Sequence, residues 1–363
     1  MMLKIENKRE LFFEKRKHLI NSILSGESEL YIFGITKYGE IIYNQLKSKS
    51  ISIKGFVDDI TNDKTFLNES VFKTSDLPKE SIIILAIVEG RPKTLRNYLS
   101  KNGYENIVDY FDFNFIDPKK FPIPFNCGNY DKIISNIKKY ENVFEKLEDE
   151  VSKKIFLSII DFRINFNYLE HNFTYCIKDQ YFENFLNFNI IKTFIDAGGY
   201  DGSTTKNAIN RFKNLKKVFY IEPFPKSMSD SKKNLSSIKG VQLVFLETAL
   251  SKFNGFRLIT DSEGSANHLS EGGEIRVKVS SLDSIINEKI DYFKLDIEGE
   301  ELNALKGSES LIKTFKPFIA ACIYHDQNHF WQIPEYLLSL NPGYKVYVRH
   351  YTEGIYETVM YFI

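Results

Sequence analysis

The stretch "FIDAGGYDGSTT", residues 194–205, joins an apolar run that ends on an acid to three glycines within five positions. This pattern predicts a strand that ends at Asp196, a glycine-rich bend, and a helix that begins near Ser203. Backbone amides in such a βα turn can approach a ligand closely, because glycine carries no side chain. The stretch therefore predicts a site for a nucleotide-containing cofactor.

The spacing of the glycines narrows the choice of cofactor. Gly198, Gly199 and Gly202 give G-G-x-x-G, whereas a pyrophosphate-binding turn requires G-x-G-x-x-G. The carboxylate of Asp196 would repel two phosphates and attract a cationic amino group. S-adenosylmethionine carries an ammonium and a sulfonium and no phosphate, so it fits better than a dinucleotide. Turns of this kind also occur for purely structural reasons.

The composition excludes several classes of protein. At 363 residues with 43% hydrophobic content, the chain is long enough for two globular domains. Lys and Arg (48) balance Asp and Glu (48), so nothing indicates nucleic-acid binding. The N-terminus is charged and the longest apolar run, residues 82–88, is too short to span a bilayer. We expect a cytoplasmic protein without a membrane span.

The three cysteines, Cys127, Cys176 and Cys322, are scattered and lack C-x-x-C spacing. This pattern is typical of reduced thiols, and we expect neither a disulfide nor a structural zinc ion.

Hydrophobic patterning divides the chain into four parts. Residues 1–25 form a charged helical segment, and residues 26–116 contain the strand–turn–helix–strand pattern of a small Rossmann-like α/β domain. Residues 117–190 begin with three prolines between 118 and 124 and continue as amphipathic helices. These helices could pack internally or between subunits, so the sequence leaves open whether the protein forms a homo-oligomer. Residues 191–363 carry a second, longer run of alternating strands and helices.

The end of this second run indicates its fold class. Strands are expected at residues 192–198, 217–223, 241–250, 292–299 and 317–325, with a hairpin formed by residues 256–260 and 275–282. The last two strands, residues 344–351 and 357–363, are too close together for a helical crossover and should pair antiparallel. A parallel sheet closed by an antiparallel terminal hairpin is the architecture of the class I methyltransferases.

Two acids and an alanine follow the next strands at positions that suit adenosine. Glu222 lies 20 residues beyond Gly202 at a strand end, where an acid can accept hydrogen bonds from both ribose hydroxyls. Glu247 and Ala249, in "ETALS", end the third strand, where the loop would border the adenine. The alternative interpretation of Glu222 is a solvated acid at a strand end.

The sequence "KLDIEGEE" contains four acids within six residues. Asp296 and Glu298 should point to one side of the extended chain, where they could bind an ammonium, take a proton from a hydroxyl or hold a divalent ion. Glu301 is more typical of a helix first turn stabilised by the dipole. His325 ends the following strand and is a candidate base beside a carboxylate, or an ordinary capped polar group.

With these residues assembled, the C-terminal half resembles the FkbM family of S-adenosylmethionine-dependent methyltransferases. The matching stretches, in family order, are "DQYF" (179–182), "FIDAGGYDGSTT", "YIEPFP", "VSSLDSI", "YFKLDIEGEE", "YHDQNHFWQIPEYL" and "RHY...ETVMYF".

The resemblance implies a class I fold and an enzyme that often O-methylates sugars or other secondary metabolites. It implies cofactor binding over residues 196–202, Ser203 and Glu222, with Gln180 and Tyr181 closing over the cofactor. It also implies that Asp296, Glu298 and His325 face the methyl group.

We therefore expect an O-methyltransferase that acts on a saccharide or sugar nucleotide, in bacterial surface polysaccharide or glycoconjugate biosynthesis. Its base would be His325, or a carboxylate from Asp296 and Glu298, and assistance by a divalent metal is left open. One alternative is an enzyme that binds NAD or a nucleotide sugar through the N-terminal domain, although Gly34 and Gly39 lack a middle glycine. The other is a non-catalytic scaffold that binds S-adenosylmethionine.

Overall fold

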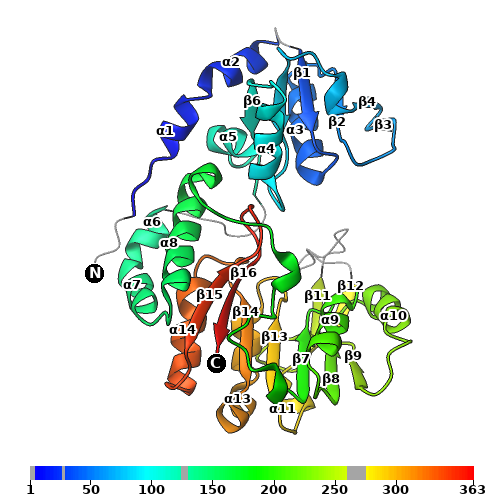
Figure 1. The fold of residues 1–363 in the computed structure, drawn as a ribbon, viewed down its shortest axis with the longest axis vertical. Coiled ribbons are helices and arrows are strands. Elements are labelled where there is room, and N and C mark those ends of the chain that lie inside the picture. The colour runs from blue at the N-terminus through cyan, green and yellow to red at the C-terminus, as the bar shows by residue number, and fades with distance from the viewer. Residues whose placement is uncertain (1–4, 27–28, 124–129, 260–274) are drawn as a thin grey trace.

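A computed structural model of the protein describes residues 5–26, 29–123, 130–259 and 275–363. Figure 1 shows two α/β units, one above the other, with a group of helices beside and between them. No helix within these described ranges is long and apolar enough to cross a membrane. Cys176 and Cys322 are free thiols, and Cys127 lies outside the described residues.

The N-terminal unit is built on a six-stranded sheet of order β3-β4-β2-β1-β5-β6. All neighbouring strands pair parallel except β3, which pairs antiparallel with β4. The strands are β1 (Leu30–Phe33), β2 (Gly55–Val57), β3 (Thr65–Phe66), β4 (Glu69–Phe72), β5 (Ile82–Leu85) and β6 (Ile107–Asp109). The helices are α1 (Arg9–Glu14), α2 (Lys17–Ser25), α3 (Lys37–Ser48), α4 (Pro92–Lys101) and α5 (Tyr110–Ile116). Because β2 and β5 flank β1 on opposite sides, the strand order reverses at β1 and leaves a crevice position at the carboxyl ends of β1 and β5.

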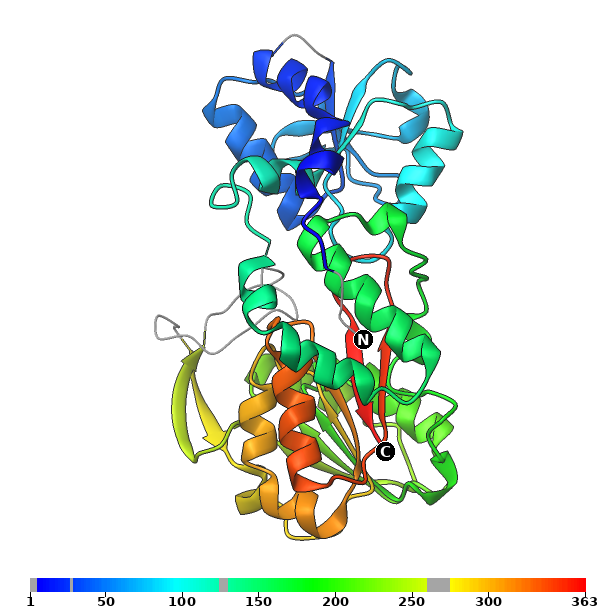
Figure 2. The ribbon, with the colours of Figure 1, turned by 90° about the vertical axis from the view of Figure 1, so that its left-hand side faces the viewer.

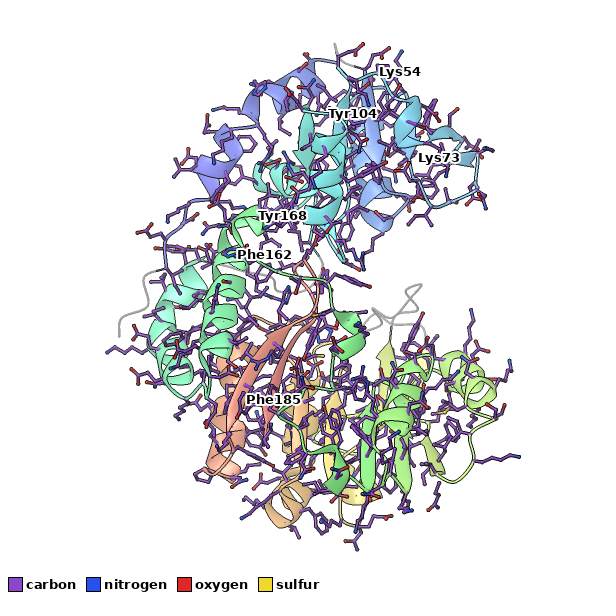
Figure 3. The ribbon with its side chains drawn as sticks, in the orientation of Figure 1. Lys54, Lys73, Tyr104, Phe162, Tyr168 and Phe185 are labelled. Carbon is purple, nitrogen blue, oxygen red and sulfur yellow. The ribbon has the colours of Figure 1, made fainter. Side chains whose placement is uncertain are left out.

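The middle of the chain forms α6 (Tyr130–Ser135), α7 (Ile137–Glu145) and α8 (Glu150–Asn165). Within the chain, α7 packs on α14 and α8 packs on β15. Phe162 and Tyr168 lie at the junction between the two units (Figure 3), where both rings contact Phe111 of α5. The Tyr168 hydroxyl donates to Asp109 Oδ1 at 2.6 Å. These contacts make one continuous buried core that runs from Ile20 to Phe362.

The C-terminal unit contains a seven-stranded sheet of order β15-β16-β14-β13-β7-β8-β9. Its strands are β7 (Thr193–Ala197), β8 (Lys217–Ile221), β9 (Gln242–Leu246), β13 (Tyr292–Leu295), β14 (Phe318–Cys322), β15 (Val346–His350) and β16 (Thr358–Phe362). Its helices are α9 (Ser203–Arg211), α10 (Pro225–Asn234), α11 (Leu282–Ile285), α12 (Glu301–Lys306), α13 (Glu309–Phe315) and α14 (His329–Leu340). Strand β16 pairs antiparallel with both β14 and β15, and the other neighbours pair parallel. This confirms the fold class predicted from the sequence.

The strand expected over residues 241–250 is divided in two. After β9, the chain leaves the main sheet at Glu247, and β10 (Ala249–Leu250) joins a small sheet with β12 (Ile275–Ser280) and β11 (Gly255–Ile259). The Thr248 hydroxyl lies 2.9 Å from the Ser280 hydroxyl and holds this crossing point. The hairpin of β11 and β12 forms as predicted. Figure 2 shows it beside the main sheet.

Candidate functional site

A cavity of about 390 Å³ opens at the carboxyl ends of β7, β8, β13 and β14. This volume lies in the range of small-molecule sites, about 300–1,000 Å³. The turn between β7 and α9 contributes a large share of its wall, through Gly198, Gly199, Tyr200, Asp201, Ser203 and Thr204. The predicted cofactor turn therefore borders a cavity of suitable size.

Close packing explains two glycines of this turn. Gly198 has φ +77°, and a Cβ atom there would lie 1.7 Å from the carbonyl oxygen of Asp296. A Cβ atom at Gly199 would lie 2.2 Å from the ring of Tyr220. Gly202 is the N-cap of α9 and does not line the cavity. The turn thus lets backbone meet backbone between β7 and β13, as well as forming the cavity wall.

Asp196 corrects one prediction, because it does not line the cavity. Its side chain is fully buried, with Oδ1 3.1 Å from Lys294 Nζ and Oδ2 accepting a hydrogen bond from the Thr205 hydroxyl. Lys294 Nζ also donates to the carbonyl of Gly198 at 2.7 Å. Burial lowers the pKa of Lys294, but the charges of Asp196 and Asp296 outweigh this and raise it. Asp196 therefore supports the turn through a buried ion pair.

Sequence reasoning missed Lys294. The signal was present as a lysine within the apolar strand "YFKLD", since a buried lysine requires a charged partner.

Glu222 lines the cavity, as its predicted role requires. Its Oε2 accepts a hydrogen bond from the Tyr200 amide and its Oε1 from the Phe224 amide, both at 3.0 Å. Burial raises the pKa of Glu222. The two amide donors stabilise the ionised form and lower the pKa, but burial has the larger effect. Ala249 also lines the cavity, whereas Glu247 points into solvent and does not. The predicted contact of Glu247 is therefore corrected: the chain leaves the sheet there and turns that side chain outward.

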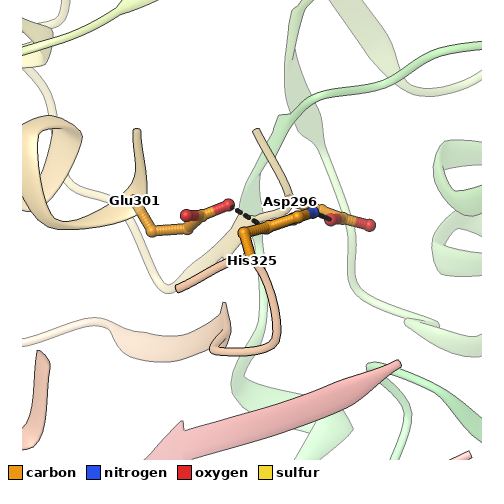
Figure 4. Close-up of side chains that lie close together, drawn as sticks. All are labelled: Asp296, Glu301 and His325. Atoms are coloured by element: carbon orange, nitrogen blue, oxygen red, sulfur yellow. Dashed lines mark ion pairs between the residues drawn. The ribbon is translucent and has the colours of Figure 1, made fainter. Parts of the chain in front are cut away.

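His325 lies between carboxylates (Figure 4). Its Nδ1 is 2.8 Å from Glu301 Oε1, and its Nε2 is 3.3 Å from Glu298 Oε2 and 3.7 Å from Asp296 Oδ1. Glu301 is fully buried, and the same Oε1 accepts hydrogen bonds from the amides of Ile297 and Gly299. The expectation that Glu301 serves the helix dipole is therefore incomplete, because it is the buried counter-charge of His325.

Electrostatics settle the protonation of this group. Burial lowers the pKa of His325, but the charges of Glu301 and Glu298 outweigh burial and raise it well above the usual value. Burial raises the pKa of Glu301, but His325 and His329 reverse this and lower it to about 2. His325 is thus an imidazolium at neutral pH.

These protonation states change the expected role of His325. An imidazolium has no lone pair with which to take a proton, and His325 does not line the cavity. Asp296 and Glu298 do line it, and burial raises the pKa of Glu298. The expectation that His325 meets the reacting hydroxyl is therefore corrected, and its place is behind the two carboxylates.

Asp296, Glu301 and His325 each offer a ligand atom, and these atoms lie within 4.8 Å of one another. The geometry nevertheless does not fit one divalent ion. Glu301 meets Nδ1 and Asp296 faces Nε2, so the imidazole ring lies between the two carboxylates (Figure 4). An ion bound to either nitrogen would have the other carboxylate on the far edge of the ring. The imidazolium is the cation that this arrangement accommodates.

Gln180 and Tyr181 line the cavity at the end near β14 and β16. The Tyr181 hydroxyl donates to Asp296 Oδ2 at 2.8 Å, and the Gln180 amide donates to Glu357 Oε2 at 2.5 Å. The Tyr324 hydroxyl donates to Asp296 Oδ1 at 2.9 Å. Sequence reasoning missed Glu357, which lines the cavity from the connection between β15 and β16.

Left-handed backbone is concentrated at this cavity. Tyr181, Tyr200, Glu298 and Glu357 have φ values of +70°, +50°, +57° and +68°, and all four line the wall. Non-glycine residues adopt this conformation at a cost of about 1–3 kcal/mol each, and such residues gather at ligand sites.

The sheet order, the glycine-rich turn after its first strand and the acid after its second define a class I S-adenosylmethionine-dependent methyltransferase. Residues 196–347 match the family model described as the methyltransferase FkbM domain. The C-terminal unit therefore contains a methyltransferase FkbM domain, and the chain is an S-adenosylmethionine-dependent methyltransferase.

A solved structure shows the same fold over nearly the whole chain. Methyltransferase FkbM from Methylobacillus flagellatus KT is similar over 95% of this chain and 93% of its own, with 18% identity and a TM-score of 0.71. Fibrillarin from Aeropyrum pernix, with bound S-adenosyl-L-methionine, covers 49% of this chain and 69% of its own, with 11% identity and a TM-score of 0.31. An rRNA methylase from Streptococcus thermophilus aligns with 48% of this chain over 86% of its own length, with 13% identity and a TM-score of 0.32. No curated protein matches the chain significantly.

Proposed function

We propose that the protein transfers a methyl group from S-adenosylmethionine to a hydroxyl of a saccharide or sugar nucleotide, in the biosynthesis of a bacterial surface polysaccharide or glycoconjugate. The observation that carries the proposal is Glu298, a cavity-lining carboxylate in strained backbone with an imidazolium behind it. Acids of this kind can hydrogen-bond and deprotonate a hydroxyl. The compartment and the pathway are part of the proposal.

The cavity residues fit the cofactor. Glu222 and Ala249 line the cavity, where Glu222 would accept hydrogen bonds from the ribose and Ala249 would border the adenine. Asp296, Gln180 and Tyr181 line another part of the cavity wall, where they would contact the methionine part of the cofactor. When bound, S-adenosylmethionine supplies an electrophilic methyl group on a sulfonium.

The contribution of the chain to the reaction is alignment and proton removal. The cavity wall holds the acceptor hydroxyl in line with the methyl group, and such alignment supplies much of the rate enhancement in displacement reactions. The carboxylate of Glu298 takes the hydroxyl proton and so makes the oxygen a better nucleophile. His325, held by Glu301, fixes the Glu298 carboxylate in place, so we name it a positioning residue.

The test is methyl transfer from S-[methyl-³H]adenosylmethionine to a panel of sugar nucleotides. Replacing Glu298→Gln should lower turnover by about 100-fold or more, because general base catalysis contributes about 10²–10⁴-fold. Wild-type turnover should rise with pH through the raised pKa of Glu298, since only the ionised form accepts a proton.

Glu300→Gln is the matched control for this substitution. Glu300 also lines the cavity, but its Oε2 already accepts hydrogen bonds from Ser251 and Asn303. We expect this variant to stay within about tenfold of the wild type. Equal activity of Glu298→Gln and wild type would refute the role of Glu298, and transfer to none of the sugar nucleotides would refute the acceptor class.

A chelator tests the metal that the sequence left open. Because the ring of His325 separates Glu301 from Asp296, we expect turnover to be unchanged after treatment with EDTA and gel filtration. Loss of turnover that Mg²⁺ or Mn²⁺ restores would contradict this expectation.

Neither alternative function has a specific observation in its favour. Gly34 and Gly39 pack against each other, since a Cβ atom at Gly39 would lie 2.3 Å from the Gly34 carbonyl oxygen. The Thr36 side chain caps α3 by accepting from the Gly39 amide. These contacts give the turn after β1 a structural role, which accounts for the glycines without NAD or a nucleotide sugar. Glu298 and Glu357 line the cavity with strained backbone, which argues against a scaffold that only binds the cofactor.

A further inference from the structure

The connection between β15 and β16, residues 351–357, reaches the N-terminal unit (Figure 1). The Glu353 amide donates to the carbonyl of Gly90 at 2.8 Å, and the Glu353 carboxylate accepts from the amide and hydroxyl of Thr94, at the start of α4. A Cβ atom at Gly354 would lie 2.5 Å from the carbonyl oxygen of Val88. We call residues 352–356 the hairpin tip.

The hairpin tip thus packs at the carboxyl end of β5, on one side of the crevice position of the N-terminal sheet. The Tyr356 hydroxyl lies 3.2 Å from that of Tyr38 in α3, on the side of β1. Parallel sheets of this kind usually bind their ligands at this position. Here the chain itself supplies the side chains that contact both flanking elements.

The next residue, Glu357, lies at the methyltransferase cavity. Its Oε2 accepts from Gln180, and its Oε1 lies 3.5 Å from the Tyr324 hydroxyl, which also donates to Asp296. One hydroxyl therefore bridges Glu357 and Asp296. The other charged groups that influence Glu357 are His325 and Glu298.

The charges at this end of the cavity are unbalanced. Lys294 is paired with Asp196, and His325 is paired with Glu301. Asp296 and Glu298 face the other nitrogen of the same imidazolium, and Glu357 accepts hydrogen bonds from neutral side chains. The carboxylates at this end of the cavity therefore outnumber the cations and repel one another. Burial, together with the charge of Asp296, raises the pKa of Glu357 to about 7. A cationic group placed between the two carboxylates would relieve the repulsion.

We propose that Glu357 and Asp296 form a carboxylate pair that receives the α-ammonium group of S-adenosylmethionine, and that the N-terminal domain holds Glu357 in place through the docked hairpin tip. This rests on the proposed cofactor site. It assigns the ammonium to residues from two strand ends, in place of the buried Asp196. It also gives the N-terminal domain a role in cofactor binding without a ligand of its own.

Two ligands separate this role from a merely structural one. S-adenosylhomocysteine carries the α-ammonium, whereas 5′-methylthioadenosine has the same adenosine and lacks the amino-acid part. In calorimetric titrations, Glu357→Gln should weaken the binding of S-adenosylhomocysteine by about 10- to 100-fold, which is the range for loss of a hydrogen bond to a charged group. The same substitution should leave the affinity for 5′-methylthioadenosine unchanged. Equal losses for both ligands, or no loss for either, would overturn the proposal.

Proton release gives a second readout. An ammonium favours the ionised form of Glu357, so binding of S-adenosylhomocysteine near pH 7 should release protons from the wild type. The binding enthalpy should then depend on the ionisation enthalpy of the buffer, and this dependence should vanish in Glu357→Gln. The same buffer dependence in both proteins would overturn the assignment to Glu357.

The docked tip is tested by Gly354→Val, whose side chain would collide with the Val88 carbonyl, and by the milder Glu353→Gln. Both substitutions should weaken the binding of S-adenosylhomocysteine, Gly354→Val by about tenfold or more. Neither should change the affinity for 5′-methylthioadenosine. Wild-type affinity in Gly354→Val would overturn the role of the N-terminal domain. If the wild type bound neither ligand, the proposed cofactor site would itself have failed.

Discussion

Glu301→Gln lowers the free energy of unfolding of the C-terminal domain by about 3 kcal/mol at pH 7, as expected when one partner of a buried ion pair is removed. Glutamine keeps an acceptor for the amides of Ile297 and Gly299 and removes only the charge. The imidazolium of His325 would then lose its closest counter-charge, at 2.8 Å. Turnover should fall as well, because His325 positions Glu298.

The single tryptophan makes this measurement specific. Trp331 lies in α14, two residues after His329, whose Nδ1 is 3.4 Å from Glu301 Oε2. Its fluorescence during urea denaturation therefore reports on the domain that contains Glu301. Glu309→Gln, at an exposed glutamate paired with Lys313, should leave the transition unchanged. A Glu301→Gln transition that coincides with the wild type would refute the buried ion pair.

The pH dependence of stability follows from the same pair. The pKa of Glu301 is about 2 in the folded protein and 4.5 without the fold, so its contribution is full above pH 4.5 and is lost as the pH falls toward 2. His325 contributes to stability with the opposite pH dependence, because its pKa is raised in the folded protein. Its contribution is present below pH 6.5 and is lost as the pH rises through the pKa of the folded state. Glu301→Gln should lose the acid-side dependence and reduce the alkaline one.

Gly198→Ala should abolish detectable binding of S-adenosylhomocysteine and reduce methyl transfer by about 100-fold or more. The added Cβ atom would lie 1.7 Å from the Asp296 carbonyl oxygen, so the turn and the end of β13 must separate by more than about 1 Å. A displacement of about 1 Å in a site costs about 10²-fold in rate. The backbone also has φ +77°, which alanine tolerates poorly.

Gly240→Ala separates these two causes. Gly240 has φ +81°, but a Cβ atom there would meet nothing within 4 Å. This variant therefore carries the backbone strain without the collision, and calorimetry should find its affinity for S-adenosylhomocysteine equal to that of the wild type. If Gly198→Ala bound as well as Gly240→Ala, the close approach of β7 and β13 would be irrelevant to the cofactor site.

Local patterns were enough to predict much of the architecture. The run from Phe194 to Ser203 indicated a strand, a turn and a helix, and the short connection before Thr358 indicated an antiparallel pair. The spacing to Glu222 placed an acid at the next strand end, where it lines the cavity. Such features depend on neighbours in sequence and on the alternation of side chains in a strand, so they survive without knowledge of the tertiary contacts.

By itself, the sequence determined most of the order of strands and helices in the C-terminal unit, the glycine-rich turn after β7 and most of the acids at the strand ends. Only the tertiary structure decided which acids are neutralised: Asp196 by Lys294, and Glu301 by His325. It also decided that Glu357 reaches the cavity beside the docked hairpin tip. The reason is that the charge and protonation of a buried group depend on partners that are distant in the chain and on exclusion of water, neither of which a local pattern records.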